Sequence, residues 1–176
     1  MIPFPPKKYA IIYADPPWSY NNKAPRGSAA GHYDTQSNTW IADLPVLDIA
    51  APDCLLFMWI TLPKLPECLA VLDAWGFKYK TTAFVWIKHN TKTPSLFWGM
   101  GYWTRSNAEI CVLGVRGKPK RRSAGVHSVI LSAIDKHSKK PAETRDRIVK
   151  LAGDLPRIEL FARESSPGWD AWGNQI

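Results

Sequence analysis

Residues 9–22, YAIIYADPPWSYNN, decide how the rest of the chain can be interpreted. The apolar run that opens the stretch has the length and composition of a buried β-strand, and it ends on Asp15, two prolines and Trp18. Proline lacks a backbone N–H and holds φ near about −65°, so Pro16 and Pro17 stiffen the turn and offer carbonyl acceptors with no donor beside them. The stretch therefore predicts a strand that ends in a carboxylate, two rigid carbonyls and an indole ring.

Five further apolar runs have the same character. All are continuous rather than alternating, as in strands that are covered on both faces. With the first run, the predicted strands are 10–14, 54–60, 82–87, 109–115, 127–131 and 157–162. Apolar residues at helical spacing predict helices at 62–75, before Gly76, and at 141–152, before Gly153. This alternation predicts an α/β fold with a mostly parallel sheet and helices on both faces, and the third and fourth strands, with no helix between them, predict an antiparallel hairpin at one edge.

The composition is that of one folded domain. The 176 residues suit a single domain over 1–176, and the 45% hydrophobic content argues against disorder. No apolar run approaches the length of roughly 18 residues that spans a membrane, and the N-terminus lacks the apolar segment of a signal peptide. Three cysteines, Cys54, Cys68 and Cys111, lie in apolar surroundings without metal-ligand spacing. We therefore expect a cytoplasmic protein without a metal site.

The charge balance favours a polyanionic partner. The chain has 23 basic and 15 acidic residues, a net charge of +8, and the segment RGKPKRR at 116–122 holds five cations and no anion. The nine Trp, six Tyr and six Phe residues belong either to the core or to surfaces on which nucleic-acid bases stack. The long polar or basic stretches 19–40, 88–107 and 116–126 fit no regular element, and loops of this length are commonly functional.

The chemistry of the opening stretch suits an amine on a flat ring. Open α/β sheets bind ligands beyond the carboxyl ends of their strands, where Asp15 would lie. The Asp15 carboxylate and the Pro16 carbonyl could accept both hydrogens of the adenine N6 amine and free its lone pair for attack, while Trp18 stacks on the base for about 1–3 kcal/mol. In this scheme Asp15 orients the amine rather than acting as a strong base, because an ordinary Asp pKa is about 4. The alternative is a plain turn, since Asp is common before Pro.

The segment ADPPW at a strand end resembles the catalytic motif of amino-methyltransferases that act on adenine N6. The chain is similar to the MT-A family, which includes the messenger-RNA adenosine methyltransferases and their bacterial and phage relatives. Eight further segments follow in the family's order, and together they span nearly the whole chain. They are HYDT (32–35), LLFMWIT (55–61), WGF (75–77), VWIK (85–88), AEICVLGVRG (108–117), HSKKPAE (137–143), RIELFAR (157–163) and GWDAWGN (168–174).

The resemblance implies an enzyme with S-adenosyl-L-methionine as cofactor and a Rossmann-like methyltransferase fold in permuted motif order. By this resemblance Asp15, Pro16, Pro17 and Trp18 are the catalytic residues. The implied cofactor-binding residues are Asp15, Lys140, Glu159, Phe161, Arg163, Asn174 and Gln175. Lys140 would meet the methionine carboxylate at a helix start, and 159, 161 and 163 would share one face of the last strand. The alternatives are a solvated Lys140, an ion pair over a core Phe, and a frayed C-terminus. The glycine-rich loop of other methyltransferases is absent.

The resemblance also implies a nucleic-acid substrate whose target base is flipped out or single-stranded. The candidate substrate-binding residues are Trp18, Tyr33, Lys88, Lys92, Arg105, Lys118, Lys120, Arg121 and Arg122. Trp98, Tyr102 and Trp103 either stack on neighbouring bases or form a small hydrophobic cluster that closes their loop. We expect DNA rather than RNA, with short or relaxed sequence specificity, because the chain lacks the additional RNA-binding modules of the messenger-RNA enzymes.

Three alternatives remain beside a DNA adenine methyltransferase. The first is an N6-adenosine RNA methyltransferase, and the second is an inactive nucleic-acid-binding partner subunit, which would typically lose the Asp-Pro-Pro-Trp residues that are intact here. The third, a zinc deaminase, needs an H-x-E and a P-C-x-x-C pattern, and neither occurs. Besides nucleic acid, the candidate partners are a second copy of the chain and a methyltransferase-like subunit, and no membrane is expected.

Overall fold

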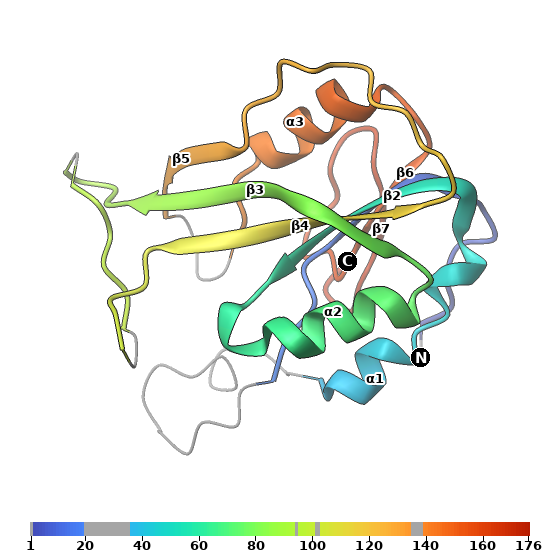
Figure 1. Cartoon of the computed structure of the whole chain (residues 1–176), viewed down its shortest axis with the longest axis horizontal. Helices are drawn as coiled ribbons and strands as arrows, with labels where there is room; N and C mark the ends of the chain where they lie inside the picture. Colours follow the sequence, from blue (N-terminus) through green and yellow to red (C-terminus); the bar gives the residue numbers. More distant parts are fainter. Residues whose placement is uncertain (1, 20–35, 94, 101–102, 135–138) are drawn as a thin grey trace.

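Seven strands of the described residues form one mixed sheet in the order β5-β3-β4-β2-β1-β6-β7 (Figure 1). The computed structural model describes residues 2–19, 36–93, 95–100, 103–134 and 139–176. The strands are β1 (Tyr9–Ala14), β2 (Ala50–Ile60), β3 (Lys78–His89), β4 (Ala108–Arg116), β5 (Val129–Ala133), β6 (Arg157–Leu160) and β7 (Asp170–Trp172). The helices are α1 (Asn38–Ala42), α2 (Leu65–Ala74) and α3 (Glu143–Ala152), with short 3-10 turns at Val46–Asp48 and Leu62–Lys64. The α/β class is therefore confirmed.

All six predicted strands are present, although their ends differ by up to four residues. Two elements are not predicted by the sequence. The strand β7 has only three residues, too few to show a hydrophobic period. The helix α1 begins at the end of the polar stretch 19–40, and its signal is a cap: the Ser37 hydroxyl accepts a hydrogen bond from the Trp40 backbone N–H at 3.1 Å.

The sheet is mostly parallel, as predicted. Strand β1 runs parallel to β2 and β6, β6 parallel to β7, and β3 parallel to β5, whereas β4 runs antiparallel to both β2 and β3. The predicted hairpin of β3 and β4 exists, but its predicted place at an edge of the sheet is wrong. β5 pairs along the outer side of β3 and forms that edge. A local pattern shows that two strands follow one another, but it does not show which free edge a later strand joins.

Both long helices end at glycines that take the left-handed conformation. At the end of α2, Gly76 has φ 79° and donates its N–H to the Asp73 carbonyl, while Phe77 N–H donates to the Leu72 carbonyl. These two bonds satisfy carbonyls that the helix leaves without partners. Gly153, with φ 96°, ends α3 in the same region of backbone conformation. The predicted helices are thus present, and α3 begins two residues later than the pattern indicates.

Helices cover both faces of the sheet, as predicted (Figure 1). On one face, α1 and α2 bury side chains such as Ile41 and Leu72 against Ile12 of β1. On the other, Ile148 of α3 packs against Ile11 and its neighbours. Consecutive β1 residues thus enter different core clusters, which is why the strand reads as a continuous apolar run. No helix in the described part of the chain is long and apolar enough to cross a membrane.

Candidate active site

Asp15 follows β1 directly and lies at the carboxyl ends of three parallel strands in the middle of the sheet. From β1 the chain passes through α1 on one face to β2, whereas α3 on the other face leads to β6, on the opposite side of β1. Connections that diverge to opposite faces leave a crevice at the strand ends, and α/β sheets bind ligands there. The position of Asp15 is therefore the one at which this fold offers a site.

The two proline carbonyls already have backbone partners. Trp18 N–H donates to the Pro16 carbonyl at 2.8 Å, and Gln36 N–H donates to the Pro17 carbonyl at 3.0 Å. The expectation that no donor lies beside these carbonyls is therefore wrong, because Trp18 closes a tight turn on Pro16 and a parallel bridge between Trp18 and Gln36 brings the Gln36 N–H to Pro17. A carbonyl oxygen has two lone pairs, so each retains one acceptor position. The hydrogen bonds fix the direction in which that position points.

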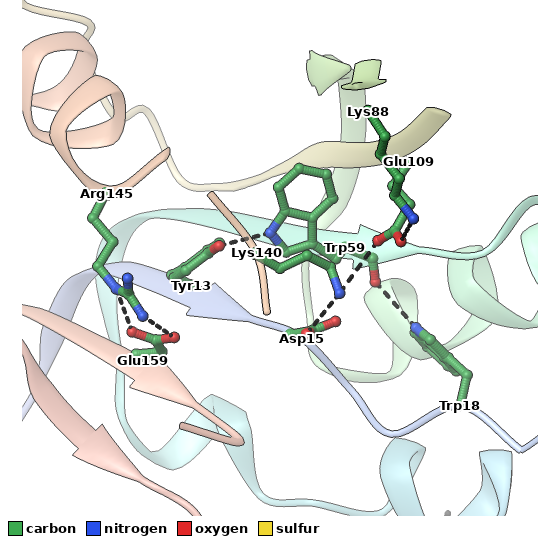
Figure 2. Close-up of polar contacts among 9 residues, drawn as sticks. All are labelled: Tyr13, Asp15, Trp18, Trp59, Lys88, Glu109, Lys140, Arg145 and Glu159. Carbon is green, nitrogen blue, oxygen red and sulfur yellow. Dashed lines mark hydrogen bonds and ion pairs between the residues drawn. The ribbon is translucent and has the colours of Figure 1, made fainter. Parts of the chain in front are cut away.

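A line of alternating charges begins at Asp15 (Figure 2). The Lys140 ammonium lies 2.8 Å from the Asp15 carboxylate and 3.3 Å from the Glu109 carboxylate. Glu109 also accepts a hydrogen bond from the Lys88 ammonium at 2.5 Å. The Lys140 side chain is only 10% exposed, so these charges interact with little screening by solvent. Lys140 is therefore held between two carboxylates.

The pKa values in this line reflect a balance between burial and pairing. Burial raises the pKa of the Asp15 carboxyl above its ordinary value, although Lys140 acts in the opposite direction. Burial alone would lower the pKa of the Lys140 ammonium, but Asp15 and Glu109 outweigh it and raise that pKa. Burial likewise acts to raise the pKa of Glu109, and Lys140 and Lys88 reverse the sign and lower it. The cation at Lys140 is thus firmly retained, and Asp15 depends on it for its charge.

Trp59 of β2 contacts residues on both sides of it in the site, Lys140 and Tyr13 through its ring and Trp18 through its backbone (Figure 2). Its ring lies beneath the Lys140 ammonium, with 5.7 Å between Nζ and the ring centroid. Its backbone carbonyl accepts a hydrogen bond from the Trp18 indole N–H at 3.0 Å. Its own indole N–H donates to the Tyr13 hydroxyl at 2.7 Å. Trp18 is only 5% exposed, so its ring is a fixed wall rather than a mobile flap.

We expect Tyr13→Phe to lower the free energy of unfolding by about 1–3 kcal/mol, because the buried Trp59 indole N–H loses its acceptor. Urea unfolding followed by Trp fluorescence measures the change. Tyr9→Phe is the matched control: its hydroxyl bonds Asp170, which keeps Lys7 as a partner. Equal stability losses in the two variants would contradict a special role for the hydrogen bond at Trp59.

Two cavities adjoin Asp15. The first cavity, of about 240 Å³, is lined by both aromatic rings and side-chain amides. Its lining consists of Ile2, Asp15, Pro17, Gln36, Trp40, Phe161, Arg163, Trp172, Gly173, Asn174 and Gln175. The second cavity, of about 190 Å³, is more polar and includes Pro16, Trp18, Trp59, Lys88, Glu109 and Lys140. Asp15 lines both, so it stands at the boundary between two adjacent binding volumes.

The predicted cofactor residues divide among three places. Asp15, Phe161, Arg163, Asn174 and Gln175 line the first cavity, and Lys140 lines the second. Glu159 lines neither in the described part of the chain. It accepts two hydrogen bonds from the Arg145 guanidinium at 2.7 and 2.8 Å, with both side chains largely buried (Figure 2). The geometry of Glu159 is that of a structural ion pair between β6 and α3.

The prediction that residues 159, 161 and 163 share one face of a strand is wrong. Strand β6 ends at Leu160, and Phe161 has φ 61°, a conformation that interrupts the alternation of side chains. Phe161 consequently packs edge-to-face on Trp172 of β7, with ring centroids 5.5 Å apart. The turn lets Phe161 and Arg163 reach the first cavity while Glu159 remains on the α3 side.

A close backbone contact shapes the floor of the first cavity. A Cβ added at Gly173 would lie 2.3 Å from the Ala162 carbonyl oxygen, and Ala162 N–H bonds the Trp172 carbonyl at 3.0 Å. We expect Gly173→Ala to separate β6 from β7 locally and to weaken cofactor binding at least about tenfold, a loss of about 1.4 kcal/mol. Isothermal calorimetry measures the affinity. Gly125→Ala, where an added Cβ would lie 3.9 Å from the Ser123 hydroxyl oxygen, an ordinary contact, is the control and leaves it unchanged.

The predicted substrate residues also separate. Trp18 and Lys88 line the second cavity. Lys92 and Arg105 are exposed in the connection between β3 and β4, which lies at the same strand ends as Asp15. Tyr33 and Tyr102 lie outside the described residues. Trp103 is 99% exposed, so the expectation of a closed hydrophobic cluster fails for this ring.

The basic segment 116–122 lies at the opposite ends of the strands from Asp15. Strand β4 runs from Glu109, beside Lys140, to Arg116, which pairs with Cys54 near the start of β2. At about 3.3 Å per residue this separates the two ends by about 20 Å. The antiparallel direction of β4 therefore places Lys118, Lys120, Arg121 and Arg122 far from Asp15, and their predicted contact with nucleic-acid phosphates stays a prediction.

Sequence reasoning missed Glu109, Trp59 and Trp40. Glu109 had a signal, since a carboxylate in an otherwise apolar strand needs a partner. Trp40 and Trp59 carried none beyond their aromatic character, because their importance comes from which strands and helices lie side by side.

An α/β sheet with a carboxylate at its switch point, between an aromatic cavity and a polar one, has the arrangement at which proteins of this class bind their ligands. The MT-A70 family matches residues 9–175. The chain belongs to this family of S-adenosylmethionine-dependent N6-adenine methyltransferases, and the predicted resemblance is confirmed.

Individual relatives cover the chain almost completely. The type II methyltransferase M.MunI of Mycoplasma sp is 37% identical over 194 residues, which is 98% of this chain and 79% of the relative. The human N(6)-adenosine-methyltransferase catalytic subunit METTL3 is 30% identical over 173 residues, 96% of this chain and 28% of the relative. The Arabidopsis thaliana N(6)-adenosine-methyltransferase MT-A70-like is 28% identical over 171 residues, 96% of this chain and 24% of the relative. The chain thus spans most of the bacterial relative but about a quarter of the plant and animal ones.

Proposed function

We propose that this chain transfers a methyl group from S-adenosyl-L-methionine to the N6 amine of adenine in DNA. One observation carries the proposal: the Asp15 carboxylate lines both cavities and is held by Lys140 at 2.8 Å. In a methyl transfer, the group that holds the acceptor amine must have the methyl donor on one side and the adenine base on the other. The two cavities supply these two volumes.

The residues of the first cavity fit the cofactor by chemistry. S-adenosylmethionine supplies an electrophilic methyl group on a sulfonium cation. Asp15 offers a carboxylate for that positive charge, and Asn174 and Gln175 offer amides for a base edge or ribose hydroxyls. Arg163 suits a carboxylate at the amino-acid end, and Phe161 provides an aromatic surface.

The ion pairs change the roles that two residues are proposed to have. Lys140 is engaged with Asp15 and Glu109, so we assign it the orientation of Asp15 before any contact with a methionine carboxylate. Glu159 is engaged by Arg145, and we assign it the support of β6 rather than a contact with ribose.

In the second cavity the protein's own groups hold the amine. The Asp15 carboxylate and the remaining lone pair of the Pro16 carbonyl accept the two N6 hydrogens, which turns the nitrogen lone pair toward the first cavity. Trp18, fixed by its bond to Trp59, forms a wall against the base. Asp15 acts by orientation and charge, and the proton leaves to water. The base enters extruded or single-stranded, at a cost of a few kcal/mol for a paired base, so roughly that much must come from contacts with the base.

We favour DNA over RNA as the polymer. The relative that matches over the larger share of both chains is a bacterial type II methyltransferase, whereas the adenosine methyltransferases extend far beyond this chain. The net charge of +8 suits either polymer. The second candidate is therefore an N6-adenosine RNA methyltransferase. The recognition sequence that we propose is short or relaxed.

We further propose that residues 1–176 act as one cytoplasmic methyltransferase domain with a Rossmann-like fold in permuted order. In support, the catalytic strand β1 comes first in the chain, whereas Phe161, Arg163 and most of the first cavity follow β6. A second copy or a methyltransferase-like subunit is the proposed protein partner.

Incubation with labelled S-adenosylmethionine tests the function directly. Matched DNA and RNA oligonucleotides, single- and double-stranded, are digested afterwards and examined by mass spectrometry for N6-methyladenine. Methyladenine in DNA supports the proposal, and methyladenine in RNA alone supports the second candidate. Absence of both product and cofactor binding by calorimetry would overturn the enzyme assignment.

A further inference from the structure

A group of cations gathers where β3 begins and β4 ends. Lys78 of β3 pairs with Val115, the residue before Arg116, and the connection after β4 then reaches the end of α3, where Arg122 N–H bonds the Leu151 carbonyl at 2.7 Å. We call this region the basic edge. It consists of Lys78, Lys80, Arg116, Lys118, Lys120, Arg121, Arg122 and Lys150. It lies at the opposite edge of the sheet from Asp15.

The basic edge is both exposed and anchored. Lys118, Lys120, Arg121 and Arg122 are exposed, and none of them makes an ion pair with a described residue. Their backbone is nevertheless tied down, because Lys118 N–H donates to the Asp53 carboxylate at 2.7 Å and Arg122 N–H to α3. Cations on an anchored loop lose less conformational freedom on binding than cations on a mobile one.

Few acids offset these cations. Asp53 is engaged by the loop backbone, and Asp154 lies 2.6 Å from the Arg157 guanidinium. Asp73, at the end of α2, and Asp48, next to the Leu47 that lies against Gly76, are further carboxylates near the start of β3. The C-terminal end of α3 adds partial negative charge from its carbonyls, which favours Lys150 and Arg122 beside it. The edge therefore presents a clear excess of positive charge to solvent.

A straight duplex that lies across the strand ends at Asp15 does not reach the basic edge. A duplex whose adenine enters the second cavity lies against the edge that carries Asp15, about 20 Å from Arg116 along β4. DNA has a persistence length of about 50 nm, so turning it around a protein of this size within a few base pairs is strongly unfavourable. The basic edge is consequently available to a different stretch of DNA.

We propose that the basic edge is a second binding surface, which takes the phosphate backbone of duplex DNA separately from the stretch being methylated. The proposal rests on the proposed function only for the choice of DNA as the polyanion. Exposed Lys and Arg without base-edge contacts read charge rather than sequence. The surface thus adds salt-dependent affinity for long DNA and holds the protein near the polymer between methylation events.

The test counts duplexes on the protein. A duplex of about 14 base pairs, roughly 48 Å long, occupies only one edge at a time when it lies across the strand ends. Sedimentation without cofactor is expected to give two such duplexes per wild-type protein and one per Lys118→Gln/Lys120→Gln/Arg121→Gln/Arg122→Gln variant. For a duplex of about 60 base pairs, the same variant should bind at least about tenfold more weakly at 0.1 M NaCl, and its log–log salt slope should fall by about 3–4.

The matched control is Lys92→Gln/Arg105→Gln, which removes two exposed cations from the edge that carries the cavities. It should retain the duplex bound to the basic edge. The two-residue variant Lys120→Gln/Arg121→Gln should give about half the change in salt slope, which guards against a folding defect in the larger variant. Equal numbers of duplexes on the wild type and on the four-residue variant would overturn the proposal. One duplex on the wild type and none on the variant would keep the basic edge and instead contradict DNA binding at the cavities, so the two failures are distinguishable.

Discussion

Asp15→Asn is expected to lower kcat for N6-adenine methylation by about 10²–10³-fold, the loss typical of removing one preorganised electrostatic partner from an active site. The amide has nearly the shape of the carboxylate but no charge, and its NH₂ group is a donor where the amine needs an acceptor. It also leaves Lys140 with Glu109 as its only carboxylate partner among the described residues. The protein should stay folded, because Asp15 lies beside open cavities rather than inside the core.

Single-turnover kinetics with saturating cofactor separates this loss from weaker binding. Asp43→Asn, at the exposed C-terminal end of α1, is the matched control and should leave kcat unchanged. A decrease of less than about fivefold, or roughly 1 kcal/mol, would contradict the role assigned to the carboxylate.

Lys140→Met is expected to move the acidic limb of the pH–rate profile to higher pH by at least about one unit. In the native protein the ammonium acts against the effect of burial on Asp15. Without it, Asp15 faces Glu109 unscreened, and the Asp15 pKa rises further. An acid with a higher pKa loses its charge at a higher pH as the solution is acidified. Activity that depends on the Asp15 carboxylate therefore disappears earlier on the acid side, and at neutral pH the rate falls by about 10–100-fold.

Two further variants make this test specific. Lys139→Met removes the adjacent cation, which pairs with Glu164 at the surface, and should leave the profile in place. Adding Glu109→Gln to Lys140→Met removes the repelling carboxylate and should return part of the shift. An acidic limb that stays in place in Lys140→Met would show that Lys140 does not control the charge of Asp15.

The sequence indicates the strands well because of where they lie. Strand β1 is buried on both faces, with Ile11 in one core cluster and Ile12 in the other. Its continuous run of apolar residues therefore predicts a buried strand. The turn after it could be predicted to bring Asp15 to a ligand-binding edge for the same reason. What the sequence does not state is register between strands distant in the chain. Glu109 meets Lys140 only because β4 lies inside the sheet.

Two other parts of the site were beyond local patterns. Phe161 takes a positive φ, which few non-glycine residues adopt, and this one backbone angle separates the side chains of Glu159 and Phe161. The basic segment 116–122 is obvious in composition, but its position depends on the direction of β4. Charge can be counted from a sequence, whereas the edge of the sheet that carries it follows only from the topology.

The shared carboxylate has a thermodynamic consequence. Because Asp15 lines both cavities, any occupant of the first cavity that changes its charge or rotamer changes the affinity of the second. Linkage requires the reverse effect to be of the same size, so cofactor and adenine must either help or hinder each other by one common factor. A positively charged donor that engages Asp15 competes with the amine for the same oxygens, whereas its uncharged product does not. The two ligands of the proposed reaction are therefore coupled through one side chain, and exchanging charged donor for neutral product resets the affinity for the base.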